Sequence, residues 1–155
     1  MEHRKHIRLG EFLTGKGLIS DEELKNALKV QAATKELLGA IVVKSGYISA
    51  RKLLHALSEH FGIPLVRLKD RYIKWDVVTK FSATLILEHR FFPIESDGIS
   101  VTVAVTNPLD VWGLKKLNEE ANDLIPNIVL VSEEDMDEAI KRYRAFIRDR
   151  LDNIL

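Results

Sequence analysis

Hydrophobic positions recur at helical spacing through the N-terminal part of the chain, and the whole pattern occurs twice. Residues 37–60 (copy two) align with residues 8–31 (copy one) without a gap. In each copy an apolar stripe predicts a helix, a glycine ends it, and a serine precedes a second apolar stripe. We therefore expect residues 1–62 to form a helical lobe of two repeated helical hairpins. The identical pairs are Leu9/Leu38, Gly10/Gly39, Gly17/Gly46, Ile19/Ile48, Ser20/Ser49, Leu24/Leu53, Ala27/Ala56 and Leu28/Leu57.

Glycine and serine mark the turn between the two helices of each copy. Gly17 and Gly46 are expected to end the first helix in a left-handed conformation, which glycine adopts at little cost. Ser20 and Ser49 are expected to cap the second helix, and Ser20 with Glu23 predicts a capping box. Two copies of one unit can pack as pseudo-symmetric partners, and such a pair suits a ligand that is itself two-fold.

From residue 63 onward the pattern changes to short strands and helices. The dipeptide Asp97-Gly98 predicts a two-residue hairpin turn, and a strand–helix–strand order predicts a right-handed crossover with a parallel strand pair. The expected fold class is α+β, with a duplicated four-helix lobe and then a small α/β lobe, residues 63–155, that ends in a long helix. Strands are predicted at 65–68, 91–95, 99–106 and 128–131. Helices are predicted at 75–81, from the turn 107–110 to about residue 121, and after the cap at Ser132.

The composition excludes several classes of protein. Lys plus Arg number 23 and Asp plus Glu number 23, and this balance argues against a protein that coats DNA or RNA. The chain has no cysteine, which excludes disulfides and cysteine zinc sites. The longest apolar run, residues 37–43, is too short to span a membrane, and the N-terminus lacks the apolar core of a signal peptide. We therefore expect a cytoplasmic protein without direct membrane insertion.

Residues 10–17 nearly match the phosphate-binding loop G-x-x-x-x-G-K-[ST]. We reject the match because residue 17 is glycine, so the hydroxyl that binds magnesium is missing, and because no strand is predicted before the segment. The serines follow glycine-containing turns at helix starts, where capping explains them. We therefore expect no catalytic residues and no enzyme activity.

Metal and DNA sites have no support in the sequence either. His55 and His60 fall on different faces of a helix, His3 and His6 lie at the terminus, and no histidine pair has the H-E-x-x-H spacing. The segment 17–20 followed by a helix could belong to a helix-turn-helix DNA reader. That helix begins with three carboxylates, however, where bases and phosphates would have to bind. We expect no metal site and no nucleic-acid polymer as a partner.

Several motifs come in the order found in one protein family. They are RLGEFLTGKGLIS from residue 8, its copy LLGAIVVKSGYIS from residue 37, then GIPLVRL, FFPIESDGISVTVAVTNPLD and EEDMDEAIKRY. Over about residues 7–143 they resemble the N-terminal domain of type II secretion and type IV pilus assembly ATPases. The resemblance implies a regulatory or adaptor domain whose partner is a protein of a secretion or pilus machinery. Whether an ATPase domain follows in the native protein stays open.

In one branch of that family the doubled motif binds cyclic di-GMP, and each copy holds one half of the ligand. The resemblance implies contacts from an Arg-Leu-Gly start, two leucines of the second helix and a closing glutamine. Copy one carries the full set, whereas Leu37 and His60 replace the arginine and the glutamine in copy two. Asp110 is an additional candidate if the α/β lobe folds over the site. The candidate ligand-binding residues are Arg8, Leu9, Gly10, Leu24, Leu28, Gln31, Leu38, Gly39, Leu53, Leu57 and Asp110.

The expected function is docking onto a protein of that machinery, and cyclic di-GMP sensing is the alternative. Arginine offers a planar fork to a guanine edge or a phosphate, and leucines shield bases from water, as cyclic di-GMP sensing requires. The leucines and glycines also build the hairpin core, so only Arg8 and Gln31 have no evident packing role. Docking requires an exposed apolar patch, for which Trp75, Trp112 and Tyr47 are the candidates.

Overall fold

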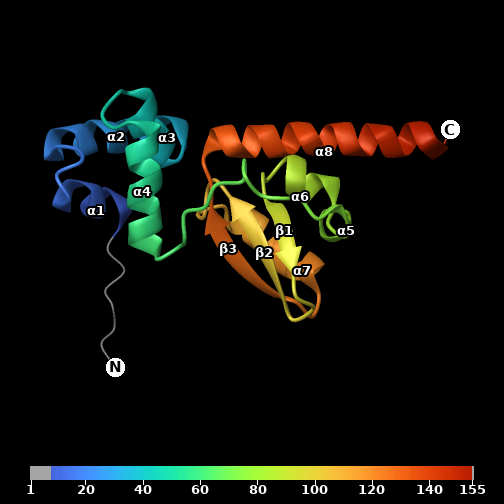
Figure 1. Cartoon of the computed structure of the whole chain (residues 1–155). Coiled ribbons are helices and arrows are strands. Elements are labelled where there is room, and N and C mark those ends of the chain that lie inside the picture. The colour runs from blue at the N-terminus through green and yellow to red at the C-terminus, as the bar shows by residue number, and fades with distance from the viewer. Residues whose placement is uncertain (1–7, 155) are drawn as a thin grey trace. The chain divides into compact units, whose positions relative to one another are not determined.

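The chain divides into two compact units, Met1–Gly62 and Ile63–Leu155, in the computed structural model shown in Figure 1. The structure describes residues 8–154. The first unit is helical, and the second combines a small mixed sheet with helices. The α+β class predicted from the sequence is therefore confirmed.

The helical unit contains the helices that the repeat predicts. In each copy a short helix is joined by a tight turn to a longer one. The longer helices begin at the position after the predicted serine cap. Copy one comprises α1 (Leu9–Gly15) and α2 (Asp21–Thr34), and copy two comprises α3 (Leu38–Lys44) and α4 (Ala50–Phe61).

The turn inside each copy has the same hydrogen-bonded form. Gly17 has a φ of +70° and Gly46 a φ of +76°, which confirms the left-handed conformation predicted for both. The amide of Leu18 donates to the carbonyl of Leu13 at 3.0 Å, and copy two has the equivalent bond at 3.0 Å. This bond and the left-handed glycine define a Schellman motif, which satisfies carbonyls at the end of the helix.

Serine caps the second helix of each copy. The Ser20 hydroxyl accepts from the amide of Glu23 at 3.0 Å, and the Glu23 carboxylate accepts from the amide of Ser20 at 2.9 Å, so the predicted capping box is confirmed. Ser49 accepts from the amide of Lys52 at 3.2 Å. A lysine cannot return the bond that a glutamate makes at this position, so copy two has a simple cap.

The buried core of the helical unit draws on equivalent positions of the two copies. Leu13 and Val42 are equivalent and buried, and so are Ala27 and Ala56. Besides the contacts within each hairpin, α1 packs against α4 and α2 against α3. Exchanging the copies leaves this set of contacts unchanged, which is a property of a two-fold pair and not of a linear stack. The core cluster comprises Leu13, Ile19, Ala27, Ile41, Val42, Ile48 and Ala56.

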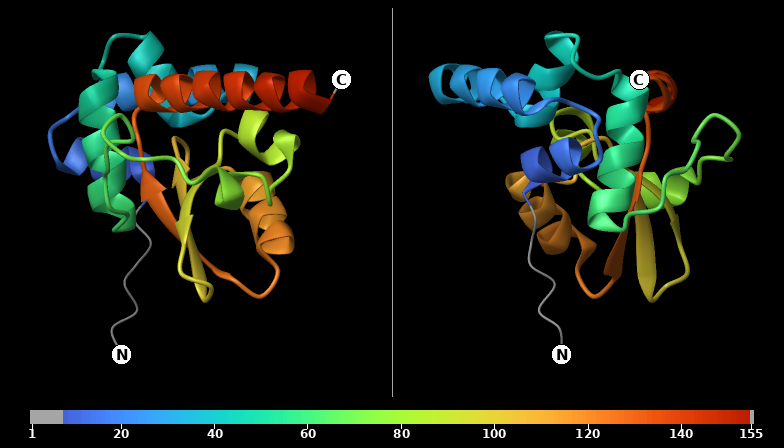
Figure 2. Two further views of the ribbon diagram at one scale, coloured as in Figure 1. Left: turned by 45° about the vertical axis from the view of Figure 1, so that its right-hand side comes forward. Right: turned by 90° about the vertical axis from the view of Figure 1, so that its left-hand side faces the viewer.

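The second unit is built on a mixed sheet with the strand order β1-β2-β3. β1 pairs with β2 in antiparallel fashion and β2 with β3 in parallel, so the predicted hairpin and parallel pair are confirmed. A helix, α7, connects β2 to β3, and the hairpin turn lies at the same end of the sheet as the α7–β3 connection (Figure 2). The elements are β1 (Phe92–Ser96), β2 (Ser100–Val105), α7 (Val111–Ala121) and β3 (Ile125–Leu130).

The hairpin turn is longer than the two residues predicted. β1 ends at Ser96 and β2 begins at Ser100, so the three residues 97–99 form the turn. The Asp97 carboxylate accepts from the amide of Ser100 at 2.7 Å and from the amide of Ile99 at 2.9 Å. These backbone hydrogen bonds lower the pKa of the Asp97 carboxyl below its ordinary value. The side chain therefore stabilises a wider turn than the dipeptide alone suggests.

In this unit one further prediction, a strand, is wrong, and another, a helix, is too long. The strand at 65–68 is reduced to one parallel bridge between Leu65 and Leu130, and the amide of Leu68 instead donates to the Asp135 carboxylate at 2.8 Å. The helix predicted at 75–81 is shorter, α5 (Trp75–Val78). A second short helix that the sequence did not predict, α6 (Ala83–Leu87), follows and is capped by Ser82.

The last helix, α8 (Glu133–Ile154), begins where the sequence predicts. Ser132 accepts from the amide of Asp135 at 3.1 Å, which confirms the cap. Near the sheet α8 packs on β1, and farther along Phe146 stacks on Trp75 with ring centroids 4.4 Å apart. Within residues 8–154 neither α8 nor any other helix combines the length and apolar character needed to cross a membrane.

Candidate functional site

The first turns of α1 and α3 meet the second helix of copy one in the helical unit. A Cβ atom added to Gly10 would lie 2.7 Å from Leu24 Cδ1 and 3.4 Å from Leu38 Cδ2. Gly10 therefore permits the close approach of these side chains. The start of the Arg-Leu-Gly motif is thereby brought together with Leu24 of α2 and with Leu38, the equivalent of Leu9 in copy two.

Copy two repeats this approach with a looser fit. A Cβ atom on Gly39 would lie 3.2 Å from Leu53 Cδ2. Leu9 and Leu38 also pack at the edge of the helical core. The motif glycines and leucines are therefore brought together in the structure, and they have a role in packing.

Arg8 is the N-cap residue of α1, and its side chain is exposed. Within the described residues no hydrogen bond or ion pair of its guanidinium is found. Leu37 holds the equivalent place at the start of α3, with φ −67° and ψ 140° against φ −61° and ψ 149° for Arg8. The two positions thus share one backbone conformation and differ in the side chain alone.

A shallow groove of about 520 Å³ runs along one face of α2. Leu28, a candidate ligand residue, is 46% exposed in it, whereas the equivalent Leu57 is buried. Lys25 and Lys29 flank the leucines, and neither makes an ion pair within the described residues. Sequence reasoning missed the two lysines, although their spacing from the motif leucines places them on that face. The groove is lined by Asp21, Leu24, Lys25, Leu28, Lys29 and Ala32.

Gln31 has a structural role that the sequence did not reveal. Its side-chain amide donates to the backbone carbonyl of Glu36 at 3.2 Å, which ties the end of α2 to the segment that leads into α3. His60, the equivalent residue, packs instead between Phe12 and Phe61, with ring centroids 4.7 and 4.6 Å away. The expectation that Gln31 lacks a packing role is therefore wrong.

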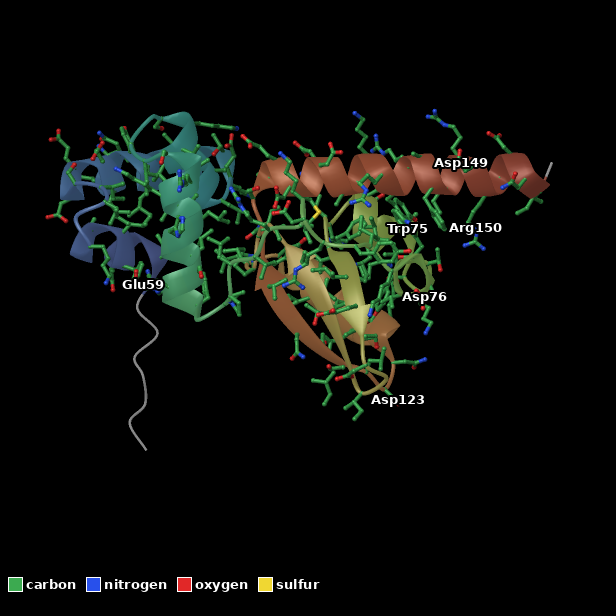
Figure 3. All side chains as sticks on the ribbon, in the orientation of Figure 1. Glu59, Trp75, Asp76, Asp123, Asp149 and Arg150 are labelled. Atoms are coloured by element: carbon green, nitrogen blue, oxygen red, sulfur yellow. The ribbon has the colours of Figure 1, made fainter. Side chains whose placement is uncertain are left out.

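An ion pair joins α1 to α4 beside these aromatic rings. Lys16 Nζ lies 2.6 Å from a carboxylate oxygen of Glu59, which is labelled in Figure 3, and 5.7 Å from the centroid of the Phe12 ring. Both charged side chains are substantially exposed, so the pair contributes little stability.

Asp110 belongs to the α/β unit, where both of its carboxylate oxygens are engaged. Oδ1 accepts from the amide of Gly113 at 2.9 Å and caps α7, and Oδ2 lies 2.8 Å from Nδ1 of His89. Asn107 accepts from the amide of Leu109 at 2.9 Å in the same turn. The predicted helix start is confirmed, and these bonds explain the aspartate at this position.

The three aromatic docking candidates have different surroundings. Trp112 is 73% exposed at the start of α7, and Val111 beside it is exposed as well. Trp75 is half-buried through its stacking on Phe146. Tyr47 packs against the helical core. Of these candidates only Trp112 offers an exposed apolar surface.

The part of the chain that the structure describes contains no group of three or more His, Cys, Asp or Glu side chains placed to hold a metal ion. His3 and His6 lie outside the described residues. The chemistry available in the helical unit is therefore that of an apolar groove with cations beside it.

A two-copy helical unit joined to a small mixed sheet defines the N-terminal domain of type II secretion and type IV pilus ATPases. The chain belongs to the MshEN domain family, whose match covers residues 61–149. This match covers most of the α/β unit, and the whole repeat at 8–60 precedes it.

Curated relatives extend the similarity over the repeat. The type IV pilus assembly ATPase PilB of Myxococcus xanthus is 31% identical over 148 residues, which cover 96% of this chain and 26% of that protein. The PilB protein of Thermus thermophilus is 34% identical over 124 residues, which cover 79% of this chain and 14% of that protein. The chain thus spans about a quarter or less of these relatives.

Solved structures share the fold. A structure of MshE with cdg matches with a TM-score of 0.82 and 25% identity, over 88% of this chain and 99% of that chain. The N-terminal domain of XpsE matches with a TM-score of 0.72 and 18% identity, over 92% of this chain and 98% of that chain. At that identity the XpsE likeness concerns the fold alone.

Proposed function

We propose that the helical unit binds cyclic di-GMP through copy one and that binding regulates a secretion or pilus assembly machinery in the cytoplasm. The observation that carries the proposal is the groove on α2, in which the motif leucines are accessible and two unpaired lysines flank them. The likeness to MshE with cdg supports the same ligand class. This role is regulatory and requires no catalytic residue.

Each residue of copy one has a chemical role in this proposal. The exposed Arg8 guanidinium donates to a guanine edge or a phosphate. Leu24 and Leu28 cover the apolar face of a base. Gly10 allows Leu24 and the first turn of α1 to approach closely. The amide nitrogen of Gln31 holds the segment between the copies in place through its bond to residue 36, and its side-chain oxygen closes this half of the ligand. Leu9, Leu38, Gly39, Leu53 and Leu57 complete the apolar surroundings in this proposal.

The two substitutions in copy two set the expected affinity. A bidentate contact is worth about 1–3 kcal/mol, so the loss of an arginine and a glutamine removes about 2–5 kcal/mol. This is a loss of roughly 30- to several-thousand-fold in affinity. We therefore expect the ligand to lie mainly on copy one, with a dissociation constant of about micromolar or weaker.

Titration calorimetry with cyclic di-GMP tests the proposal. Arg8→Ala is expected to abolish measurable heat, because it removes the principal charge-assisted contact. Arg51→Ala, which removes an exposed arginine from copy two, is the matched control and is expected to leave binding unchanged. The absence of heat for the wild-type chain at high ligand concentration, or an equal effect of the two variants, would contradict the proposal.

A second candidate function is docking onto a protein of the machinery without a nucleotide. The exposed Trp112 and Val111 favour it, since an exposed tryptophan is a common anchor of protein interfaces. Trp112→Ser is expected to weaken binding to a purified component of the machinery without changing binding of cyclic di-GMP. If the variant binds the component as the wild type does, Trp112 is not the anchor.

A further inference from the structure

The apolar stripe of α8 continues beyond the part that the α/β unit covers. Its first members, which include Met136 and Tyr143, are buried against the sheet, and burial raises the pKa of the Tyr143 phenol. The stripe continues at helical spacing through Ile147 to Leu151, which is 54% exposed, and Ile154, which is 77% exposed. A helix of a folded domain usually has this stripe covered, so the last turns of α8 have an apolar face without a partner in the described residues.

A cleft lies beside this face. Its volume is about 260 Å³, and one wall is formed by Thr79 and Phe81, which follow α5. Trp75 stacks on Phe146 of α8, and the Arg150 guanidinium lies 5.7 Å from the centroid of the Phe146 ring. Figure 3 shows Trp75 and Arg150 on the same side of α8. The α8 residues of the cleft are Tyr143, Ile147, Arg150, Leu151 and Ile154.

Positive charges flank the exposed end of the stripe. At 3.6 residues per turn, Arg144 and Arg148 lie along one edge of it and Arg150 along the other, while Asp149 and Asp152 project from the opposite face. All three arginines are exposed, and none forms an ion pair within the described residues. The apolar face is therefore bordered by unpaired cations.

From this arrangement we propose that the C-terminal half of α8, with Thr79 and Phe81, is a docking surface for an amphipathic helix with acidic flanks. Apolar residues of that helix, spaced three and four apart, would cover Ile147, Leu151 and Ile154 and enter the cleft. Its carboxylates would pair with the arginines on both edges. The surface lies in the α/β unit and is argued independently of the nucleotide site.

The three arginines beside the apolar stripe argue against a second copy of the chain as the partner that binds this surface. Two copies packed through this same face would bring Arg144, Arg148 and Arg150 of one close to those of the other. Like charges at an interface oppose association. A partner with carboxylates beside its apolar stripe removes this repulsion and adds attraction.

Fluorescence anisotropy with two labelled synthetic peptides tests the proposal. Both carry leucines at helical spacing, and the flanking positions are glutamates in one peptide and lysines in the other. The whole chain is expected to bind the glutamate peptide and not the lysine peptide, with affinity that falls as salt is added. Lack of binding to the glutamate peptide, or equal binding of the two, overturns the proposal.

Matched variants locate the surface. Arg148→Glu reverses a charge beside the stripe, whereas Arg142→Glu makes the same change on another face of the same helix. We expect about fivefold or greater weakening for Arg148→Glu and little change for Arg142→Glu. Leu151→Asp, at a mostly exposed position, is expected to remove binding without unfolding the chain. Equal effects of the two arginine variants would overturn the proposal.

Two further measurements exclude other occupants. Vesicles of phosphatidylserine and phosphatidylcholine are expected to leave the chain in the supernatant on sedimentation. Light scattering is expected to give a monomer mass that Leu151→Asp does not change. Vesicle binding or a dimer that Leu151→Asp abolishes would assign the surface to a membrane or to a second copy, and would overturn the proposal.

Discussion

Leu24 lies so close to Gly10 that no larger residue fits at position 10 without movement of the leucine, because an added Cβ would be 2.7 Å from Leu24 Cδ1. Gly39 stands in the same relation to Leu53, at 3.2 Å. The glycines of the doubled motif are thus explained first by packing inside each copy. Any ligand that uses the motif must bind on a surface that packing has already shaped.

Gly10→Ala is expected to lower the free energy of unfolding. Overpacking against Leu24 costs about 1–3 kcal/mol, and the better helix propensity of alanine offsets part of it, which leaves a net loss of about 1 kcal/mol. Gly15→Ala is the control, because nothing lies within 4 Å of a Cβ atom there and the residue is helical. That variant is expected to be neutral or slightly more stable. Urea denaturation of both variants decides, and equal stability would contradict the packing argument.

Leu37→Arg with His60→Gln is expected to strengthen binding of cyclic di-GMP by tenfold or more. Residue 37 has the backbone conformation of Arg8 and is 48% exposed, so a new arginine can extend from α3 as Arg8 extends from α1. Each restored contact is worth about 1–3 kcal/mol. Titration calorimetry measures the gain. If neither the wild type nor this double variant binds, the repeat is structural and docking becomes the better function.

Glu120→Gln is expected to destabilise the α/β unit by about 1 kcal/mol at neutral pH. Burial raises the pKa of the Glu120 carboxyl. Hydrogen bonds from the amide and hydroxyl of Ser82, together with the nearby Lys116, lower this pKa by more than burial raises it, so the pKa lies below its ordinary value. A lowered pKa means that the ionised form stabilises the folded state above the ordinary glutamate pKa. The difference between wild type and variant should therefore shrink as pH falls below about 4.5. Denaturation at pH 7 and pH 4, with Glu119→Gln as the exposed control, checks this.

The two tryptophans are expected to respond differently to substitution. Trp75→Ala removes a ring stacked on Phe146 and in edge contact with Phe92, and should lower the free energy of unfolding by about 3 kcal/mol. Trp112→Ala removes a mostly exposed ring and should change it by less than about 0.5 kcal/mol. Thermal denaturation measures both. A large loss of stability for Trp112→Ala would show that its surface is covered within the chain.

Local signals predicted most of the secondary structure. The repeat, the left-handed glycines at 17 and 46, the capping box and the start of α8 each depend on residues a few positions apart. The strand predicted at 65–68 failed because the amide of Leu68 is bound by the carboxylate of Asp135, which is distant in sequence. The helices α5 and α6 were not predicted correctly because they are too short for hydrophobic residues to recur at helical spacing.

The candidate site was predicted less completely than the fold. The motif residues were found as a set, but the bond from Gln31 to the carbonyl of Glu36 involves a backbone atom and leaves no mark in the sequence pattern. Lys25 and Lys29 were missed because charged residues on a helix are usually only solvated. Their position beside Leu28 becomes informative only once the groove is known.

The cross-packing of α1 with α4 and of α2 with α3 has a consequence for how this unit came to differ between its halves. Packing of this kind is what two separate identical chains would form as a symmetric dimer. In such a dimer both halves have the same sequence, so every substitution occurs in both of them. Once both halves share one polypeptide, each can change alone. Positions 8 and 37 can therefore carry different side chains, an arginine and a leucine, on one doubly built core.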